Sequence, residues 1–160
     1  MNRAEFVKHV ERCQKELRRF LTALCCGDTS QADDLAQDTL MKAYLSCDGL
    51  QDDKKFKSWV FRIAYNSFIS STRRINGNIG LDHASGLESS ERSDSAFKYQ
   101  ALHSALARLS EKERASTLLF YMEGYSTKEI AAMMDSTSDA VKQQLSRARV
   151  HLKSMLDNER

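Results

Sequence analysis

The sequence predicts an all-α protein made of two small helical domains that a flexible linker joins. Its 160 residues contain no proline and only six glycines, so the residues that punctuate strands and hairpins are scarce. Good helix formers fill most segments, and apolar residues recur every three or four positions. This periodicity covers residues 1–74 and 97–160, which are therefore the two expected domains, with residues 75–96 as the linker.

The first expected helix has one apolar face and ends near Gly27, a residue typical of helix ends. Its apolar face consists of Phe6, Val10, Cys13, Leu17, Phe20, Leu21 and Leu24. Because Cys13 lies within this stripe, we expect it to be a small buried core residue. The opposite face is mostly basic.

The second expected helix has an acidic outer face. Ser30 and Asp33 fit a capping start, and the inner face holds Leu35, Leu40, Ala43 and Tyr44. The outward residues are then Asp33, Asp34, Gln37 and Asp38. Since no histidine or metal-ligand partner is spaced beside these acids, a docking surface is favoured over an active site.

The third expected helix, Phe56 to Arg74, combines cations with aromatic rings. Residues 54–74 include six bases, no acid, and the aromatic residues Phe56, Trp59, Phe61, Tyr65 and Phe68. Such a mixture suits single-stranded DNA, whose phosphates need cations and whose bases stack on rings. Helical spacing favours a core role for Phe56, Trp59 and Phe68. The more accessible candidates for DNA are Lys57, Phe61, Arg62, Tyr65, Asn66, Arg73 and Arg74.

Residues 75–96 lose the helical period and are rich in glycine, serine and acids, as expected of a flexible linker. The period returns between Leu102 and Leu109. Ser110 with Glu113 then offers a capping box for a helix that reaches Met122 and stops at Gly124.

The last segment predicts a helix-turn-helix. A second capping box, Ser126 with Glu129, opens a short helix, a tight turn follows at residues 135–137, and a longer helix starts at Ser138. Its inner residues are Val141, Leu145, Ala148, Leu152 and Met155. The donors left for duplex DNA are Lys142, Gln143, Gln144, Ser146, Arg147 and Arg149. The alternative is the solvated basic face of an ordinary helical bundle.

Several functions lack support in the sequence. The four cysteines form no Cys-x-x-Cys pair and are not spaced with histidines as metal ligands are. No phosphate-binding glycine loop or nucleophile motif occurs, so we expect no catalytic residue, metal or cofactor. Because no apolar run approaches the roughly 20 residues of a membrane span and the start lacks a signal-peptide core, we expect a cytoplasmic protein without membrane insertion.

These motifs together resemble the extracytoplasmic-function (ECF) sigma factors, small members of the bacterial sigma-70 superfamily. Residues 32–44 are similar to region 2.2 of that family, and residues 56–66 to its Phe-x-x-Trp-Leu-x-x-Ile-Ala-x-Asn signature. Residues 125–131 with 141–149 resemble region 4.2. The resemblance implies a two-domain, helical initiation factor that is not an enzyme.

The resemblance also implies partners and roles for particular residues. Core RNA polymerase would bind through its clamp coiled coil to Asp33, Asp34, Gln37 and Asp38, and through its flap to the helices before the helix-turn-helix. Duplex promoter DNA at the minus-35 element would meet Lys128 and the donors of the last helix. The non-template single strand at the minus-10 element would meet the third helix together with Leu50, Asp53, Lys54 and Phe56, and a flipped base would reach a pocket at Asn66. A dedicated anti-sigma factor is a further implied partner.

Three positions depart from the family pattern: Ser70 replaces an aspartate, Asp135 a turn glycine, and Gln144 a base. Aspartate tolerates a left-handed backbone, so the turn should persist, but we derive no promoter sequence. The competing hypothesis is a stand-alone helix-turn-helix regulator. It would use the last segment alone and leave the acidic block and residues 54–74 unexplained.

Overall fold

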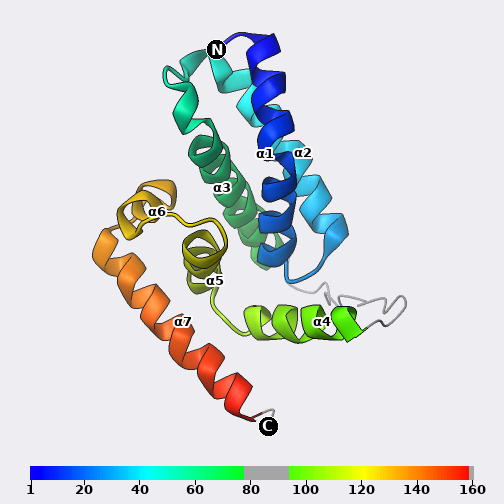
Figure 1. Ribbon diagram of the computed structural model, residues 1–160, viewed down its shortest axis with the longest axis vertical. Helices are drawn as coiled ribbons and strands as arrows, with labels where there is room; N and C mark the ends of the chain where they lie inside the picture. The colour runs from blue at the N-terminus through cyan, green and yellow to red at the C-terminus, as the bar shows by residue number, and fades with distance from the viewer. Residues whose placement is uncertain (78–93, 159–160) are drawn as a thin grey trace.

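The computed structural model describes residues 1–77 and 94–158, and within these ranges the regular structure is helical, as predicted. Three long helices form an N-terminal bundle: α1 (Arg3–Leu24), α2 (Thr29–Ser46) and α3 (Phe56–Gly77). Two short 3₁₀ turns, Cys47–Gly49 and Asp53–Lys55, connect α2 to α3. Figure 1 shows these three helices side by side in the upper half of the molecule.

The C-terminal half contains α4 (Asp94–Ala107), α5 (Glu111–Thr117), a π-helical turn (Leu118–Met122), α6 (Thr127–Met133) and α7 (Ser138–Asn158). In Figure 1 α6 lies beside α3, and α7 runs diagonally away from it toward the C-terminus. Contacts between α1 and the π-helical turn, and between α3 and α6, join this half to the N-terminal bundle.

Two of the three helix caps that the sequence predicts are present. Ser110 accepts a hydrogen bond from the Glu113 amide at 3.2 Å, and Ser126 accepts one from the Glu129 amide at the same distance. The predicted start of the second helix is wrong, because Asp28 caps α2 by accepting from the Gln31 amide at 3.1 Å. An aspartate just after a helix-ending glycine is as good a cap as serine, so the helix begins earlier than expected.

Left-handed backbone occurs among the described residues at Cys26, Gly27, Gly124 and Asp135. Asp135, in the predicted tight turn between α6 and α7, has φ 52°, which confirms the turn. Gly27, at the α1–α2 junction, has φ +91°, and a Cβ there would lie 2.7 Å from Nδ1 of His103 on α4. The glycine therefore permits both the turn and the close approach of α4.

One hydrophobic core runs through both halves of the molecule. Phe20, Leu21 and Leu24 of α1 are fully buried, as are Leu119 and Ile130 of the C-terminal half. The buried position predicted for Cys13 is confirmed, since this residue is 4% exposed. Apolar packing of the inner helix faces thus stabilises the arrangement in which the two halves contact each other.

The helices on either side of the predicted linker, residues 75–96, extend into that range, because α3 continues to Gly77 and α4 starts at Asp94. The rest of that prediction, residues 78–93, lies outside the described residues. None of the helices in the described ranges has the length and hydropathy that crossing a membrane requires.

Candidate nucleic-acid and protein interfaces

The outer face of α2 carries the predicted acidic docking surface. Asp33, Asp34, Gln37 and Asp38 are all exposed. Asp33 pairs with Arg18 at 3.5 Å and Asp38 with Lys42 at 2.9 Å, but both pairs are half in solvent and therefore contribute little stability. The side chains remain accessible to a partner.

The same helix also exposes two large apolar residues that the sequence analysis did not single out. Met41 is 65% exposed and Leu45 is 75% exposed. They follow Asp34 and Asp38 at spacings of three, seven and eleven residues, so all four lie on one helix face. The signal was present in the sequence, because both residues fall outside the inner apolar stripe. An acidic and apolar surface of this kind fits a protein partner better than DNA.

Part of the predicted single-strand surface on α3 is open to solvent. Arg62, Asn66, Arg73 and Arg74 are exposed, and the first three follow one another at spacings of four and seven residues, which places them on one helix face. Lys54 and Asp53 in the preceding turn are also exposed, and Leu50 is half-buried. Asp53 lies 3.8 Å from Nε2 of His9, an ion pair only when that imidazole is protonated.

The aromatic residues of α3 lie elsewhere. Phe56 is buried against Phe6 and Trp59, as its spacing predicted, and Phe68 is buried as well. Phe61 and Tyr65 were expected to be more accessible, and that expectation is wrong for this conformation: they are 0% and 5% exposed. The physical reason is that Phe61 stacks on Phe20 at 5.1 Å while the C-terminal half covers its other side.

Lys57 is also engaged within the molecule. Its ammonium lies 3.3 Å from Glu16 on α1 and 3.2 Å from Glu123, which follows the π-helical turn. It also lies 5.5 Å from the centre of the Phe61 ring. Among the predicted DNA residues described on α3, Lys57 alone forms an observed ion pair with the C-terminal half.

The helix-turn-helix presents most of its predicted donors outward. Lys142, Gln143, Ser146 and Arg147 are exposed on α7, and Lys128 is exposed on α6. Val141, Leu145 and Ala148 are buried on the opposite face, as predicted. This places a polar, basic surface on the long second helix of the motif.

Two predicted donors have intramolecular partners. Gln144 is half-buried, and its side-chain oxygen accepts a hydrogen bond from Ser116 of α5 at 2.6 Å. Arg149 donates through Nε to the Tyr121 hydroxyl at 2.6 Å. Gln144 therefore joins α7 to α5, whereas Arg149 remains exposed beside a groove.

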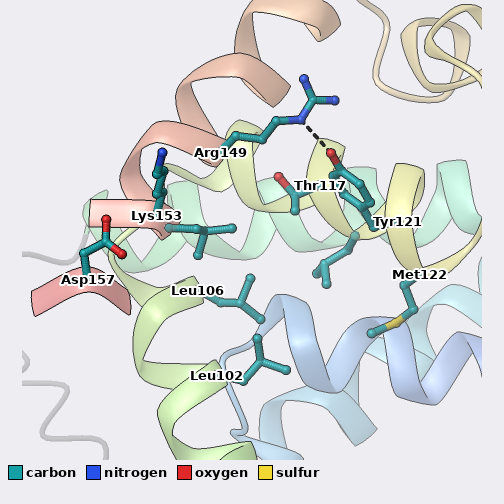
Figure 2. A pocket seen from close by; sticks show the side chains of 10 residues that line it. Leu102, Leu106, Thr117, Tyr121, Met122, Arg149, Lys153 and Asp157 are labelled. Atoms are coloured by element: carbon teal, nitrogen blue, oxygen red, sulfur yellow. Dashed lines mark hydrogen bonds between the residues drawn. The ribbon is translucent and has the colours of Figure 1, made fainter. Parts of the chain in front are cut away.

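That groove lies between α4, the π-helical turn and α7, and has a volume of about 730 Å³. Figure 2 shows Leu102, Leu106 and Met122 lining it, with Arg149, Lys153 and Asp157 around it. Leu102 and Tyr121 are 46% and 58% exposed. The sequence carries no local signal for this groove, because its lining comes from segments far apart in the chain. A groove of apolar side chains with polar ends fits the apolar face of a partner helix.

The arginine of α5 makes the most extensive buried polar contact of the described residues. Arg114 is 9% exposed and donates to the carbonyl oxygens of Leu106 at 2.9 Å, Leu24 at 2.7 Å and Leu109 at 3.2 Å. Because Leu24 ends α1, this side chain binds the negative end of that helix and joins the two halves.

The cysteines belong to no cluster of three or more potential metal ligands within residues 1–77 and 94–158. Burial raises the pKa of Cys25 to about 12 and that of Cys13 to about 11. Since the thiolate is the reactive and ligating form, both thiols are inert near neutral pH.

Two family models match the chain in succession. Residues 9–77 match Sigma-70 region 2, which spans α1 to α3. Residues 99–152 match Sigma-70, region 4, which includes the groove and the helix-turn-helix.

Known proteins of similar sequence are sigma factors. ECF RNA polymerase sigma factor EcfG of Rhodopseudomonas palustris is 28% identical over 143 residues, 88% of this chain and 78% of that protein. ECF RNA polymerase sigma factor SigL of Mycobacterium tuberculosis is 30% identical over 125 residues, 74% of this chain and 71% of that protein.

Solved structures of similar fold also include sigma factors. The sigma factor RpoE from Bartonella quintana, solved in complex with the anti-sigma factor NepR, is 28% identical with a TM-score of 0.77. That match covers 97% of this chain and 98% of the other. CnrH, solved in complex with the cytosolic domain of CnrY, is 25% identical with a TM-score of 0.76, covering 99% and 92%.

Proposed function

Because the chain belongs to the ECF RNA polymerase sigma factors of the sigma-70 family, we propose that it binds core RNA polymerase and directs it to promoters. Residues 1–74 form the domain that binds the enzyme and the minus-10 element, residues 97–160 the domain that binds the minus-35 element, and residues 75–96 connect them. One observation carries the proposal. The N-terminal half matches Sigma-70 region 2, the C-terminal half matches Sigma-70 region 4, and each half has its own exposed surface.

Binding of the core enzyme uses the outer face of α2. Its exposed carboxylates, Asp34 and Asp38, attract basic groups on the clamp coiled coil and set the orientation of docking. Met41 and Leu45 on the same face supply exposed apolar area, and methionine is among the residues enriched at protein interfaces.

Opening of the minus-10 element uses α3 and the turn before it. Arg62, Arg73 and Arg74 neutralise phosphates, and a base that leaves the duplex is held near Asn66 and the turn formed by residues 50–55. Unstacking a base costs a few kcal/mol, so contacts available only to the flipped base drive melting without a fuel molecule.

Recognition of the minus-35 element uses α7. Gln143 and Arg147 are exposed donors that can reach base edges in the major groove, while Lys142 and Lys128 contact phosphates. Because Gln144 is hydrogen bonded to Ser116, fewer side chains are free to contact DNA bases than the sequence predicted.

The apolar groove between α4 and α7 binds a protein partner, either the polymerase flap or an anti-sigma factor. Among solved structures of the same fold, the sigma factor RpoE is in complex with the anti-sigma factor NepR, and CnrH is in complex with the cytosolic domain of CnrY. The basic Arg149 and Lys153 at the groove favour a partner helix with acidic residues beside its apolar face.

The decisive experiment is transcription with purified core RNA polymerase on a genomic fragment library. Start sites should appear only when this chain is added, and a Leu45→Ser, Met41→Ser variant should lose both core binding and transcription. Val7→Ser, which removes an exposed apolar side chain on α1, serves as the control. If the chain binds duplex operators tightly as a dimer and never changes polymerase output, the stand-alone regulator is the correct function.

A further inference from the structure

A buried hydroxyl of α5 contacts both helices of the helix-turn-helix. Ser116 is 0% exposed, and its Oγ lies 2.6 Å from the side-chain oxygen Oε1 of Gln144 on α7. The same Oγ lies 3.4 Å from Sδ of Met134, the residue at the end of α6. A hydroxyl has one proton, and sulfur is a weak acceptor, so Ser116 donates to the Gln144 oxygen. The distance between the two oxygens is normal for such a bond.

This hydrogen bond fixes the orientation of the Gln144 amide. The oxygen of a glutamine amide accepts hydrogen bonds, and its nitrogen donates two. Because Oε1 is bound to Ser116, the oxygen points inward toward α5, and the other branch of the amide carries the nitrogen Nε2. Gln144 is only half-buried, so this side chain also reaches solvent. The accessible part of the amide is therefore a donor and not an acceptor.

Gln144 lies at the edge of the surface proposed for the minus-35 element. It precedes the exposed Arg147 by three residues, and side chains at that spacing are neighbours on a helix. On its other side lies the buried face of α7, which contains Val141 and Ala148. The amide nitrogen is thus placed between the core and the side chains that contact DNA.

The loss of the acceptor changes which base the amide can recognise. A free glutamine amide pairs with adenine through both of its halves, because adenine presents the N6 donor and the N7 acceptor in the major groove. Guanine presents two acceptors, O6 and N7, whereas cytosine presents only a donor. A side chain that can only donate therefore matches guanine better than adenine.

We propose that Ser116 is a positioning residue that makes Gln144 a donor-only reader of the minus-35 element, with guanine favoured at the base that it contacts. This inference rests on the proposed function of α7 in binding duplex promoter DNA. Ser116 itself touches no DNA. Its removal frees Oε1, so the preferred base changes from guanine to adenine although every side chain at the DNA surface stays the same.

The test uses full-chain variants bound to core RNA polymerase. Each complex selects duplexes from a promoter library whose minus-35 element is randomised, and the bound duplexes are sequenced. Gln144→Ala identifies the base pair that Gln144 reads, because preference is lost there. Ser116→Ala removes the hydroxyl, and Ser116→Cys keeps nearly the same volume with only a weak donor. Ser154→Ala, at an exposed serine of α7, is the matched control, and thermal unfolding verifies the fold of each variant.

We expect the wild type to select guanine at the base pair identified by Gln144→Ala. Ser116→Ala should raise the ratio of adenine to guanine there by about tenfold, which lies within the discrimination of one good bidentate contact. Ser116→Cys should change the ratio in the same direction, and Ser154→Ala should leave it unchanged. A purely structural role of Ser116 would weaken binding to all sequences alike and leave this ratio as it is.

An unchanged ratio in the folded Ser116 variants overturns the proposal. A wild-type preference for adenine at the identified base pair overturns it as well, as does a Gln144→Ala variant that keeps every wild-type preference. A failure of the proposed function has a different appearance, because the chain then selects the same duplexes without core polymerase. The base ratios of the variants are compared on those duplexes in the same way.

Discussion

Replacing Arg114 by methionine should destabilise the fold by removing one charged group that binds three carbonyl oxygens. Methionine keeps much of the buried length of the side chain, so the packing loss is small. The Leu106 carbonyl retains the Leu109 amide at 3.1 Å, but the carbonyls of Leu24 and Leu109 lose their charged donor. A buried polar group left unsatisfied costs about 1–3 kcal/mol, so two of them cost about 3 kcal/mol.

Urea unfolding followed by circular dichroism measures this loss, and thermal unfolding should show a midpoint lower by about 6–12 °C for a chain of this size. Arg108→Met is the matched control, because Arg108 is exposed in the turn between α4 and α5. Arg114→Lys should recover only part of the stability, since an ammonium cannot reproduce the fork of donors. A loss below about 1 kcal/mol for Arg114→Met, or an equal loss for Arg108→Met, would refute the reasoning.

Three further predictions address the interfaces and the thiols. Arg147→Ala should weaken minus-35 binding and reduce the slope of log affinity against log salt by about one, whereas Arg12→Ala should change neither; unchanged affinity would exclude Arg147 from the interface. Asn66→Ala should impair open-complex formation, measured by permanganate footprinting, more than core binding, and equal losses would indicate a folding defect or a wrong pocket. Cys13 and Cys25 should react with iodoacetamide at pH 8 at least about 100-fold more slowly in the folded chain than after unfolding. The reason is that burial raises the pKa of Cys13 to about 11 and that of Cys25 to about 12. Peptide mapping measures the labelling, and rapid labelling of the folded chain would contradict the prediction.

Local periodicity was sufficient to predict the helices. Side chains return to the same face of a helix every 3.6 residues, so the buried faces of α1 and α7 can be predicted from the spacing of apolar residues alone. Capping is also local, and the caps at Ser110 and Ser126 were found for that reason. The early start of α2 at Asp28 was missed because several acceptors in a row can cap a helix, and spacing alone does not choose among them.

Contacts between distant segments were not predictable in this way. Nothing near Arg114 or Glu123 indicates that one binds the end of α1 and the other binds Lys57, because the partners are 90 and 66 positions away in the chain. The burial of Phe61 has the same origin. Its exposure depends on whether the C-terminal half lies against α3, and a single sequence carries no local signal for that choice.

In this structure the C-terminal half covers part of α3 and leaves the outer face of α2 exposed. A surface that binds DNA carries cations for the phosphates and aromatic rings for the bases. When no DNA is bound, the cations are stabilised by a carboxylate of the same molecule, and the rings by packing on another ring. Lys57 and Phe61 do this, whereas the acidic and apolar face of α2 stays exposed in the same state. In this structure the surface proposed for core polymerase is therefore accessible to a partner, whereas the Phe61 ring of the surface proposed for the single strand is not.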